Sequence, residues 1–229
     1  MKYINPSKIT DFDRSVEDKE LFFLFCISVV GKNSEVQARK INEMFSGTSH
    51  PSMKCVPMNE EAVKPLMTMR EAADLVFQWR QKRYSPFAIF RKLQDENLLA
   101  SFLTYHGIGQ YTRITKCLKQ VLSKRGGLHF TAGTTHKDLV KYHGVGPKTA
   151  RFFMLHAYTN QRVAVLDTHI LRWLSRKVDS SVLSSLISVP ESTPQIEEVY
   201  EFWETLFLGF AYKANKTPAI FDLEIWNHK

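Results

Sequence analysis

One lysine of this chain stands where its side chain can act as a nucleophile. Lys148 is the second residue of the helix expected from Pro147 onward, directly after the Gly144-Val145-Gly146 turn. A helix N terminus carries a positive partial charge that disfavours a cation, and partial desolvation has the same effect. Both favour the neutral, nucleophilic amine. The alternative is that Lys148 reaches from the first helical turn into solvent.

The sequence on both sides of this turn predicts helix. Thr135 with Asp138 three residues later is a plausible helix start, and Pro147 suits the first position of a second helix because it lacks an N–H. Apolar residues then lie on two faces of that second helix: Ala150, Phe153, Met154 and Ala157 on one, Phe152 and Leu155 on the other. A helix of this kind is normally central and buried. The pattern predicts helix, Gly-Val-Gly turn and helix over about 135–157, with glycine N–H groups suited to a phosphate.

The same phrase occurs once more, without the lysine. Tyr105 to Arg113 reads YHGIGQYTR, and Tyr111 takes the place of Lys148. The helix expected after this copy has one apolar stripe, with lysines and arginines displaced from it, which is typical of a surface helix. We therefore expect the first copy to provide a turn and a basic flank, not a second active site.

The elements that must position Lys148 are helices throughout. Apolar residues recur at helical spacing along nearly the whole chain, sustained two-residue alternation is hard to find, and Gly, Pro and Ser clusters separate the segments. This predicts an all-α protein. The apolar run from Leu21 to Val30 is too short to span a bilayer and lacks a signal peptide's basic start, so we expect a buried helix in an intracellular protein.

Composition limits the partners and cofactors. The excess of 31 Lys+Arg over 23 Asp+Glu gives a net charge of +8, which fits a polyanionic partner or an ordinary solvated surface. Cys26, Cys55 and Cys117 are scattered, without the spacing of a metal site, a disulfide framework or an iron–sulfur cluster. We expect them to be small core residues and expect no metal.

At this point two stretches together resemble a known family. HGVGPKTA (143–150) followed by VAVLDTHILRWL (163–174) is similar to the signature of the helix-hairpin-helix DNA glycosylases, an L-P-G-V-G-x-K-x-A hairpin followed by V-D-x-H. Lys148 matches the lysine of the bifunctional members, and Asp167, 19 residues downstream, matches their essential aspartate. Tyr142-His143 replaces Leu-Pro, and Leu166 replaces Val. The four-cysteine loop of the endonuclease III branch is missing, which leaves the cluster-free 8-oxoguanine glycosylase/lyases of the compact archaeal type as the most similar group.

The resemblance implies a fold and a partner. It implies two intimate helical subdomains with a DNA-binding cleft between them: a helical barrel over 20–160 that contains the hairpin, and a second subdomain formed by 1–19 and 161–229. The expected partner is double-stranded DNA with a damaged base, bound by a monomer that needs no membrane and no iron–sulfur cluster. Hairpin carbonyl groups of the family also hold a monovalent cation.

The resemblance also implies site residues. Lys148 and Asp167 are the catalytic pair, and Gly144, Val145 and Gly146 bind a DNA phosphate through their backbone. The loop SVVGKNSEVQAR (28–39) takes the place of the segment that fills the gap left by the extruded base, with Lys32 and Asn33 as candidates. Candidates for the base pocket are Phe210, Phe221, Trp226 and the C-terminal Lys229, although helical spacing favours core packing for most of the aromatic residues.

The activity that the resemblance implies is base excision by a DNA glycosylase with AP lyase activity, with 8-oxoguanine as the excised base. An oxidised-pyrimidine glycosylase/lyase of the endonuclease III kind uses the same lysine and aspartate. A non-catalytic DNA-binding module would need only the hairpin, and a monofunctional alkylbase glycosylase would need Asp167 without Lys148. Asp167 also has a structural interpretation, because it precedes the apolar helical pattern that begins at Ile170 and can serve as its N-cap.

Overall fold

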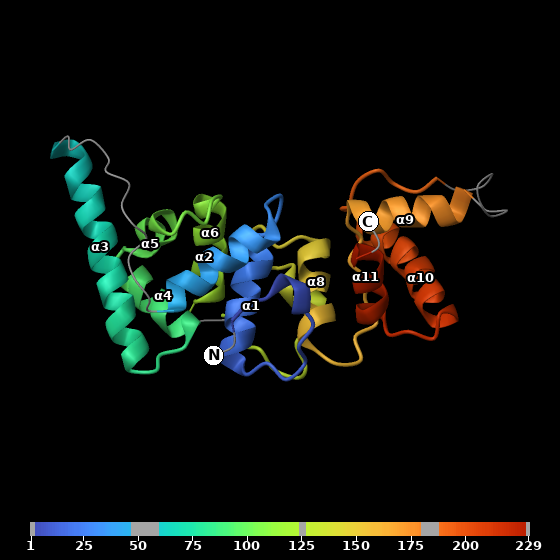
Figure 1. The fold of residues 1–229 in the computed structure, drawn as a ribbon, viewed down its shortest axis with the longest axis horizontal. Helices are drawn as coiled ribbons and strands as arrows, with labels where there is room; N and C mark the ends of the chain where they lie inside the picture. Colours follow the sequence, from blue (N-terminus) through green and yellow to red (C-terminus); the bar gives the residue numbers. More distant parts are fainter. Residues whose placement is uncertain (1–2, 47–59, 124–126, 180–187, 228–229) are drawn as a thin grey trace. The chain divides into compact units, whose positions relative to one another are not determined.

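The computed structural model describes residues 3–46, 60–123, 127–179 and 188–227, and only the backbone of 60–70. All regular structure in these ranges is helical, which confirms the all-α prediction. The helices are the 3₁₀ turn η1 (Pro6–Lys8), α1 (Val16–Ser28), α2 (Ser34–Ser46), α3 (Glu60–Gln81), α4 (Pro86–Asp95), α5 (Leu99–Tyr105), α6 (Tyr111–Val121), α7 (His136–Leu139), α8 (Pro147–Ala157), α9 (Thr168–Asp179), α10 (Glu197–Lys213) and α11 (Pro218–Asn227) (Figure 1).

The chain divides into two compact units. The first unit comprises Met1–Ile9, Arg14–Thr131 and Tyr142–Gly144. The second comprises Thr10–Asp13, Ala132–Lys141 and Val145–Lys229. The expected subdomains were 20–160 and 1–19 with 161–229, whereas α7 and α8 lie in the second unit here. In that unit α8 packs against α7 and α11.

The first unit is built around α1. A capping box between Ser15 and Asp18 starts this helix, and every residue from Glu20 to Ser28 is buried, as predicted from the apolar run. Glu20 accepts a hydrogen bond of 2.8 Å from the Phe87 N–H, which joins α1 to the start of α4. Phe23, Phe87 and Phe130 pack together with ring centroids between 5.7 and 6.4 Å apart. The remaining helices α2 to α6 pack against α1 or against one another.

The second unit has its core between α9, α10 and α11. Leu166, Ile170, Leu174, Tyr200 and Phe207 are fully buried there, with Phe221 of α11 at the edge. The α11 helix packs against α8 as well as against α9 and α10. Figure 1 shows α9 crossing the ends of α10 and α11. The α11 helix thus contacts α8, α9 and α10.

Two further expectations concern cysteines and membranes. Cys26 and Cys117 are buried free thiols, in agreement with their predicted core role, and Cys55 lies outside the described residues. Burial raises the pKa of the Cys117 thiol to about 12. Within the described part of the chain, no helix combines the length and the apolar character needed to cross a bilayer.

Candidate active site

Lys148 lies at the start of a buried helix. Gly146 is the N-cap of α8 with an extended backbone, φ −85° and ψ 173°, and Pro147 occupies the first helical position, as predicted. From Thr149 to Ala157 every α8 residue except Phe152 is buried. Lys148 itself is half-buried. Its side chain therefore starts from the first turn of a largely buried helix and is partly shielded from solvent.

Asp167 is the N-cap of α9. Its Oδ1 accepts hydrogen bonds from the His169 N–H at 2.8 Å and from the Ile170 N–H at 2.9 Å, and the residue is only 4 % exposed. Asp167 therefore does act as the N-cap of α9, the structural role that the sequence allowed. The cap uses Oδ1, and Oδ2 takes no part in these two hydrogen bonds. One aspartate can serve both as a cap and as a charged group in a site.

Asp222 of α11 is a buried carboxylate next to His156 of α8. Its Oδ2 lies 3.6 Å from Nε2 of His156, and both side chains are buried. Burial raises the pKa of Asp222, His156 lowers it, and the charges of Asp167 and Lys148 raise and lower it in turn. Asp222 is not among the residues predicted from the sequence, although an aspartate within the mostly apolar stretch FDLEIW was an available signal.

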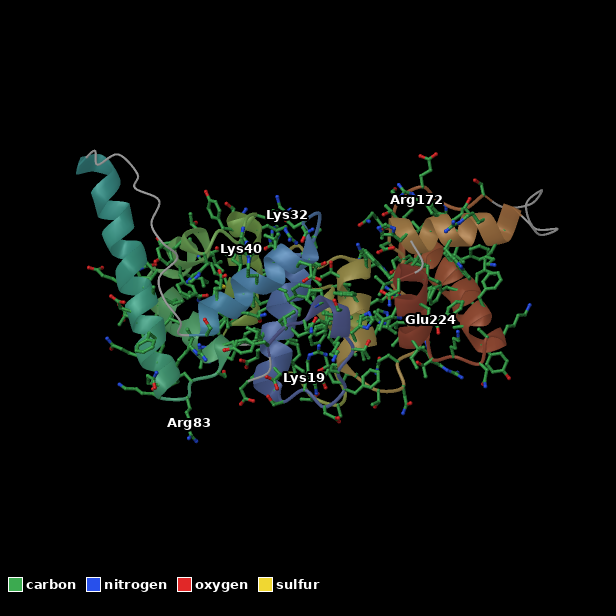
Figure 2. The ribbon with its side chains drawn as sticks, in the orientation of Figure 1. Lys19, Lys32, Lys40, Arg83, Arg172 and Glu224 are labelled. Carbon is green, nitrogen blue, oxygen red and sulfur yellow. The ribbon has the colours of Figure 1, made fainter. Side chains whose placement is uncertain are left out.

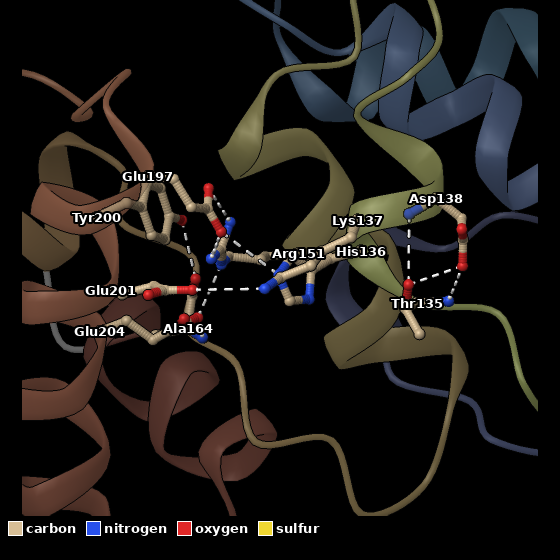
Figure 3. A network of polar contacts seen from close by, with 10 residues as sticks. All are labelled: Thr135, His136, Lys137, Asp138, Arg151, Ala164, Glu197, Tyr200, Glu201 and Glu204. Atoms are coloured by element: carbon tan, nitrogen blue, oxygen red, sulfur yellow. Dashed lines mark hydrogen bonds and ion pairs between the residues drawn. The ribbon is translucent and has the colours of Figure 1, made fainter.

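The extended stretch before Asp167 is held by side chains of α10. The Glu204 carboxylate accepts from the Ala164 N–H at 2.7 Å, and the Tyr200 hydroxyl donates to the Ala164 carbonyl at 2.9 Å (Figure 3). The same hydroxyl accepts from the Leu166 N–H at 2.9 Å. The Thr193 hydroxyl donates to the Leu166 carbonyl at 2.7 Å. These bonds satisfy buried backbone groups of a segment that has no strand partner. They set the position from which Asp167 enters α9.

Arg151 of α8 holds the same part of α10. Its side chain is fully buried, and its guanidinium donates to Glu204 at 3.0 Å and to Glu197 at 2.7 Å while lying 4.2 Å above the Tyr200 ring (Figure 3). The Arg151 bonds lower the pKa of Glu197, whereas burial raises the pKa of Glu204 against the opposing effect of Arg151. Arg151 thus links the helix of Lys148 to the residues that place Asp167. This ion pairing of Arg151 was not predicted from the sequence. The available signal was an arginine within a helix that has apolar residues on two faces.

The turn before α8 has the predicted helices on both sides. The α7 helix begins with a capping box between Thr135 and Asp138, as expected, and is a single turn long. Gly144 adopts φ +75°, which favours glycine, and Val145 is buried. In the first unit, Arg113 donates to the Gly144 carbonyl at 2.7 Å, and a side-chain carbon on Gly144 would lie 2.8 Å from Arg113 Cγ. Gly144 is therefore required both by its backbone angle and by the space around it.

Lys32 and Asn33, the candidates for filling the gap in DNA, lie in the first unit. Both are exposed, and the Asn33 side chain caps α2 by accepting from the Val36 N–H at 3.0 Å. Gln110 donates to the Val30 carbonyl at 3.1 Å, and Arg113 donates to the Ile27 carbonyl. Figure 2 labels Lys32 on this loop. The loop is thus held by the first copy of the repeated phrase, with the Lys32 side chain exposed.

The aromatic candidates for a base pocket separate into two kinds. Phe210 and Phe221 pack around Trp173, with ring centroids 5.2 and 5.3 Å away, and so belong to the core of the second unit. Trp226 is half-buried and packs against His169 of the first turn of α9, with ring centroids 4.4 Å apart and the rings tilted by 53°. Lys229 lies outside the described residues.

Basic side chains are exposed in both units. Lys116 and Lys119 of α6 are exposed in the first unit, and Arg172, Arg176 and Lys177 of α9 are exposed in the second. Figure 2 labels Arg172 on α9. The exposure of Lys116 and Lys119 agrees with the basic flank expected after the first copy of the repeated phrase. A solvated surface and a phosphate-binding surface both require this exposure.

In the described ranges, no group of three or more His, Cys, Asp or Glu side chains gathers in a way that could hold a metal ion. Comparison of the chain with protein-family models, with curated proteins and with solved structures found no match.

Proposed function

We propose that this protein is a DNA glycosylase with AP lyase activity that excises an oxidised base, 8-oxoguanine in the first instance, from duplex DNA. The observation that carries the proposal is the pairing of a half-buried Lys148 at the N terminus of a buried helix with a buried Asp167 in the same unit. A non-catalytic DNA-binding module has no need for this arrangement.

In the proposed reaction, the damaged nucleotide is extruded from the stack into the protein, at a cost of about a few kcal/mol. The Asp167 carboxylate stabilises positive charge that develops at C1′ of the sugar. The neutral Lys148 amine attacks C1′, a C–N bond forms, and the bond to the base breaks. The resulting amine adduct opens to a Schiff base, and β-elimination then breaks the DNA strand 3′ to the lesion.

DNA binding is proposed to use backbone and basic groups. The N–H groups around Gly144, Val145 and Gly146 would receive a phosphate, and exposed lysines and arginines would contact neighbouring phosphates. Trp226 is the preferred candidate for contact with the extruded base, since Phe210 and Phe221 are engaged in core packing. Binding should weaken steeply with rising salt, because each phosphate contact releases counterions.

Borohydride trapping tests the assignment. The protein is incubated with duplex DNA that contains 8-oxoguanine, and sodium borohydride reduces the Schiff base to a stable covalent adduct. Lys148→Ala should abolish the adduct, while Lys137→Ala, an exposed lysine of α7 in the same unit, should leave it unchanged. An adduct that survives Lys148→Ala undiminished would refute the proposed nucleophile.

A lesion panel tests the substrate. Duplexes that each carry 8-oxoguanine, thymine glycol or an alkylated base are scored separately for base release and for strand cleavage. Preferential release of 8-oxoguanine supports the proposal, whereas preferential release of thymine glycol would assign the protein to the oxidised-pyrimidine alternative. Base release without any cleavage would point to a monofunctional enzyme, and binding without base release to a DNA-binding module.

A further inference from the structure

The backbone that leads into Asp167 is held by side chains. Residues 161–167 form no helix or strand, and Ala164 and Leu166 are fully buried. The hydroxyl of Tyr200 on α10 donates to the Ala164 carbonyl and accepts from the Leu166 N–H, both at 2.9 Å. Buried backbone groups need such partners, because leaving them unsatisfied costs free energy. One hydroxyl therefore fixes two successive peptide groups directly before Asp167.

A carboxylate of α10 connects this backbone to the helix of Lys148. The Glu204 Oε1 atom accepts from the Ala164 N–H at 2.7 Å and from Nε of Arg151 at 3.0 Å (Figure 3). Arg151 belongs to α8 and lies nearly one helical turn after Lys148. Glu204 and Arg151 are both buried. The same oxygen atom thus contacts the helix that carries the lysine and the stretch that carries the aspartate.

The two α10 residues act from one side of their helix. Tyr200 and Glu204 are four residues apart, a spacing that puts side chains on the same face of an α-helix. The Arg151 guanidinium lies 4.2 Å from the centre of the Tyr200 ring and also donates to Glu204, so it contacts both residues. Tyr200 is fully buried and has no exposed surface with which to touch DNA. Any influence of its hydroxyl on a reaction must therefore pass through the backbone that it holds.

We propose that Tyr200 is a positioning residue, which holds the Asp167 carboxylate at the distance from the Lys148 amine that the reaction requires. This inference rests on the proposed function, because only a reaction that uses both groups depends on their spacing. Its physical basis is that displacement of a reacting group by about 1 Å can cost about 100-fold in rate. Without the hydroxyl, the two peptide groups before Asp167 lose their partner, and the carboxylate is no longer held in place.

The test removes the hydroxyl and keeps the ring. In Tyr200→Phe the ring stays against Arg151, while both hydrogen bonds to the backbone are lost. Single-turnover excision from 8-oxoguanine duplex should slow about 30-fold, with unchanged affinity for that DNA, because the groups that contact DNA are intact. Tyr158→Phe, at a buried tyrosine that follows the end of α8, is the matched control and should excise at the wild-type rate. Both variants are assayed at a temperature at which thermal unfolding shows them folded.

A double substitution separates positioning from a general weakening of the core. In Asp167→Asn the carboxylate that Tyr200 positions is already absent, so adding Tyr200→Phe should slow the remaining reaction by less than about threefold. A general weakening would slow excision equally in both backgrounds. The carbon-13 signal of the Asp167 carboxyl group provides a readout without catalysis: it should move in Tyr200→Phe and stay unchanged in Tyr158→Phe.

The possible failures point to different conclusions. Wild-type excision by Tyr200→Phe, equal losses with and without the Asp167 carboxylate, or an Asp167 signal that does not move would each refute the positioning role. A wild-type protein that releases no base and forms no borohydride adduct would refute the proposed function, and the positioning role with it. If Tyr200→Phe does not fold, Thr193→Val takes its place in every comparison, because the Thr193 hydroxyl donates to the Leu166 carbonyl of the same stretch at 2.7 Å.

Discussion

The two copies of the repeated phrase have different backbones although their letters nearly agree. Gly107 and Gly144 adopt similar left-handed angles, φ +63° and +75°. The second glycines then differ, since Gly109 has φ +64° whereas Gly146 is extended at −85°. The residue that follows Gly109, Gln110, is also left-handed at φ +50°, an angle that proline cannot adopt. Pro147 therefore excludes the conformation of the first copy from the second.

An arginine follows each turn, and the two arginines bind different kinds of partner. Arg113 donates to the backbone carbonyls of Ile27 and Gly144 and to Gln110, all in the first unit. Arg151 is fully buried in the second unit and pairs with the carboxylates of Glu197 and Glu204. The first arginine fastens a loop and a turn near the surface, whereas the second neutralises buried charge between helices. The repeated phrase is thus followed in one unit by an arginine that hydrogen-bonds to carbonyl groups, and in the other by an arginine with buried ion pairs.

The largest difference should appear when each arginine is removed. Arg151→Ala leaves Glu204 buried without its cation, and we expect it to lower the free energy of unfolding by about 3–5 kcal/mol. Arg113→Ala removes hydrogen bonds to neutral acceptors in a half-buried place, and we expect a loss of about 1–2 kcal/mol. Urea denaturation of both variants measures the difference. Equal losses would show that the ion pairs of Arg151 contribute no more to stability than the hydrogen bonds of Arg113 to carbonyl groups.

The second largest effect concerns the aspartates that begin helices in the second unit. Asparagine caps nearly as well as aspartate, so Asp167→Asn should retain the fold and lose about 100-fold in base excision, because it lacks the charge that stabilises C1′. Asp138→Asn, in the capping box of α7, is the matched control and should excise at the wild-type rate. If Asp167→Asn keeps its base-excision activity, Asp167 acts only as the N-cap of α9.

The histidines of the two copies should differ in their effect on acid stability. Burial lowers the pKa of His106, in the first copy, to about 4, whereas His143 in the second copy is exposed. In the folded state His106 stays neutral down to about pH 4, whereas in the unfolded chain it takes up a proton near pH 6.5. Its contribution is therefore complete above about pH 6.5 and is lost as the pH falls toward 4.

His106→Gln removes this titration, so the wild type should lose about 2 kcal/mol more than the variant between pH 7 and pH 4.5. Urea denaturation at both pH values provides the measurement. His143→Gln should follow the wild type at both. If His106→Gln and the wild type lose stability in parallel, His106 is not the buried neutral group that distinguishes the first copy.

The smallest effect separates the second glycines. Gly109→Ala places a side chain at a left-handed angle and should cost about 1–2 kcal/mol of stability. Gly146 has an ordinary angle and open space, with the nearest atom, Gln195 Oε1, 4.0 Å away, so Gly146→Ala should cost less than about 1 kcal/mol. If the second turn binds a phosphate, however, Gly146→Ala should weaken DNA binding where Gly109→Ala does not. Thermal unfolding and fluorescence anisotropy with duplex DNA test both halves.

Much of the local structure follows from short-range rules. The capping box at Thr135, the proline that opens α8 and the burial of α1 and α8 depend on residues within a few positions of one another, so the sequence predicts them well. The ion pairs of Arg151 were not predictable in this way. They join Arg151 to Glu197 and Glu204, 46 and 53 residues further along the chain.

The candidate site likewise combines features set by neighbouring residues with features set by contacts between distant segments. Composition and spacing alone identified an all-helical chain with a lysine at the mouth of a central helix and an aspartate that begins the next one, because helix periodicity and capping are local. Only the tertiary structure decided that Phe210 and Phe221 belong to the core, that Asn33 caps α2, and that Asp222 is buried beside His156. Those outcomes depend on which faces of distant helices meet, since burial and the charges that a side chain experiences arise from packing between segments far apart in sequence.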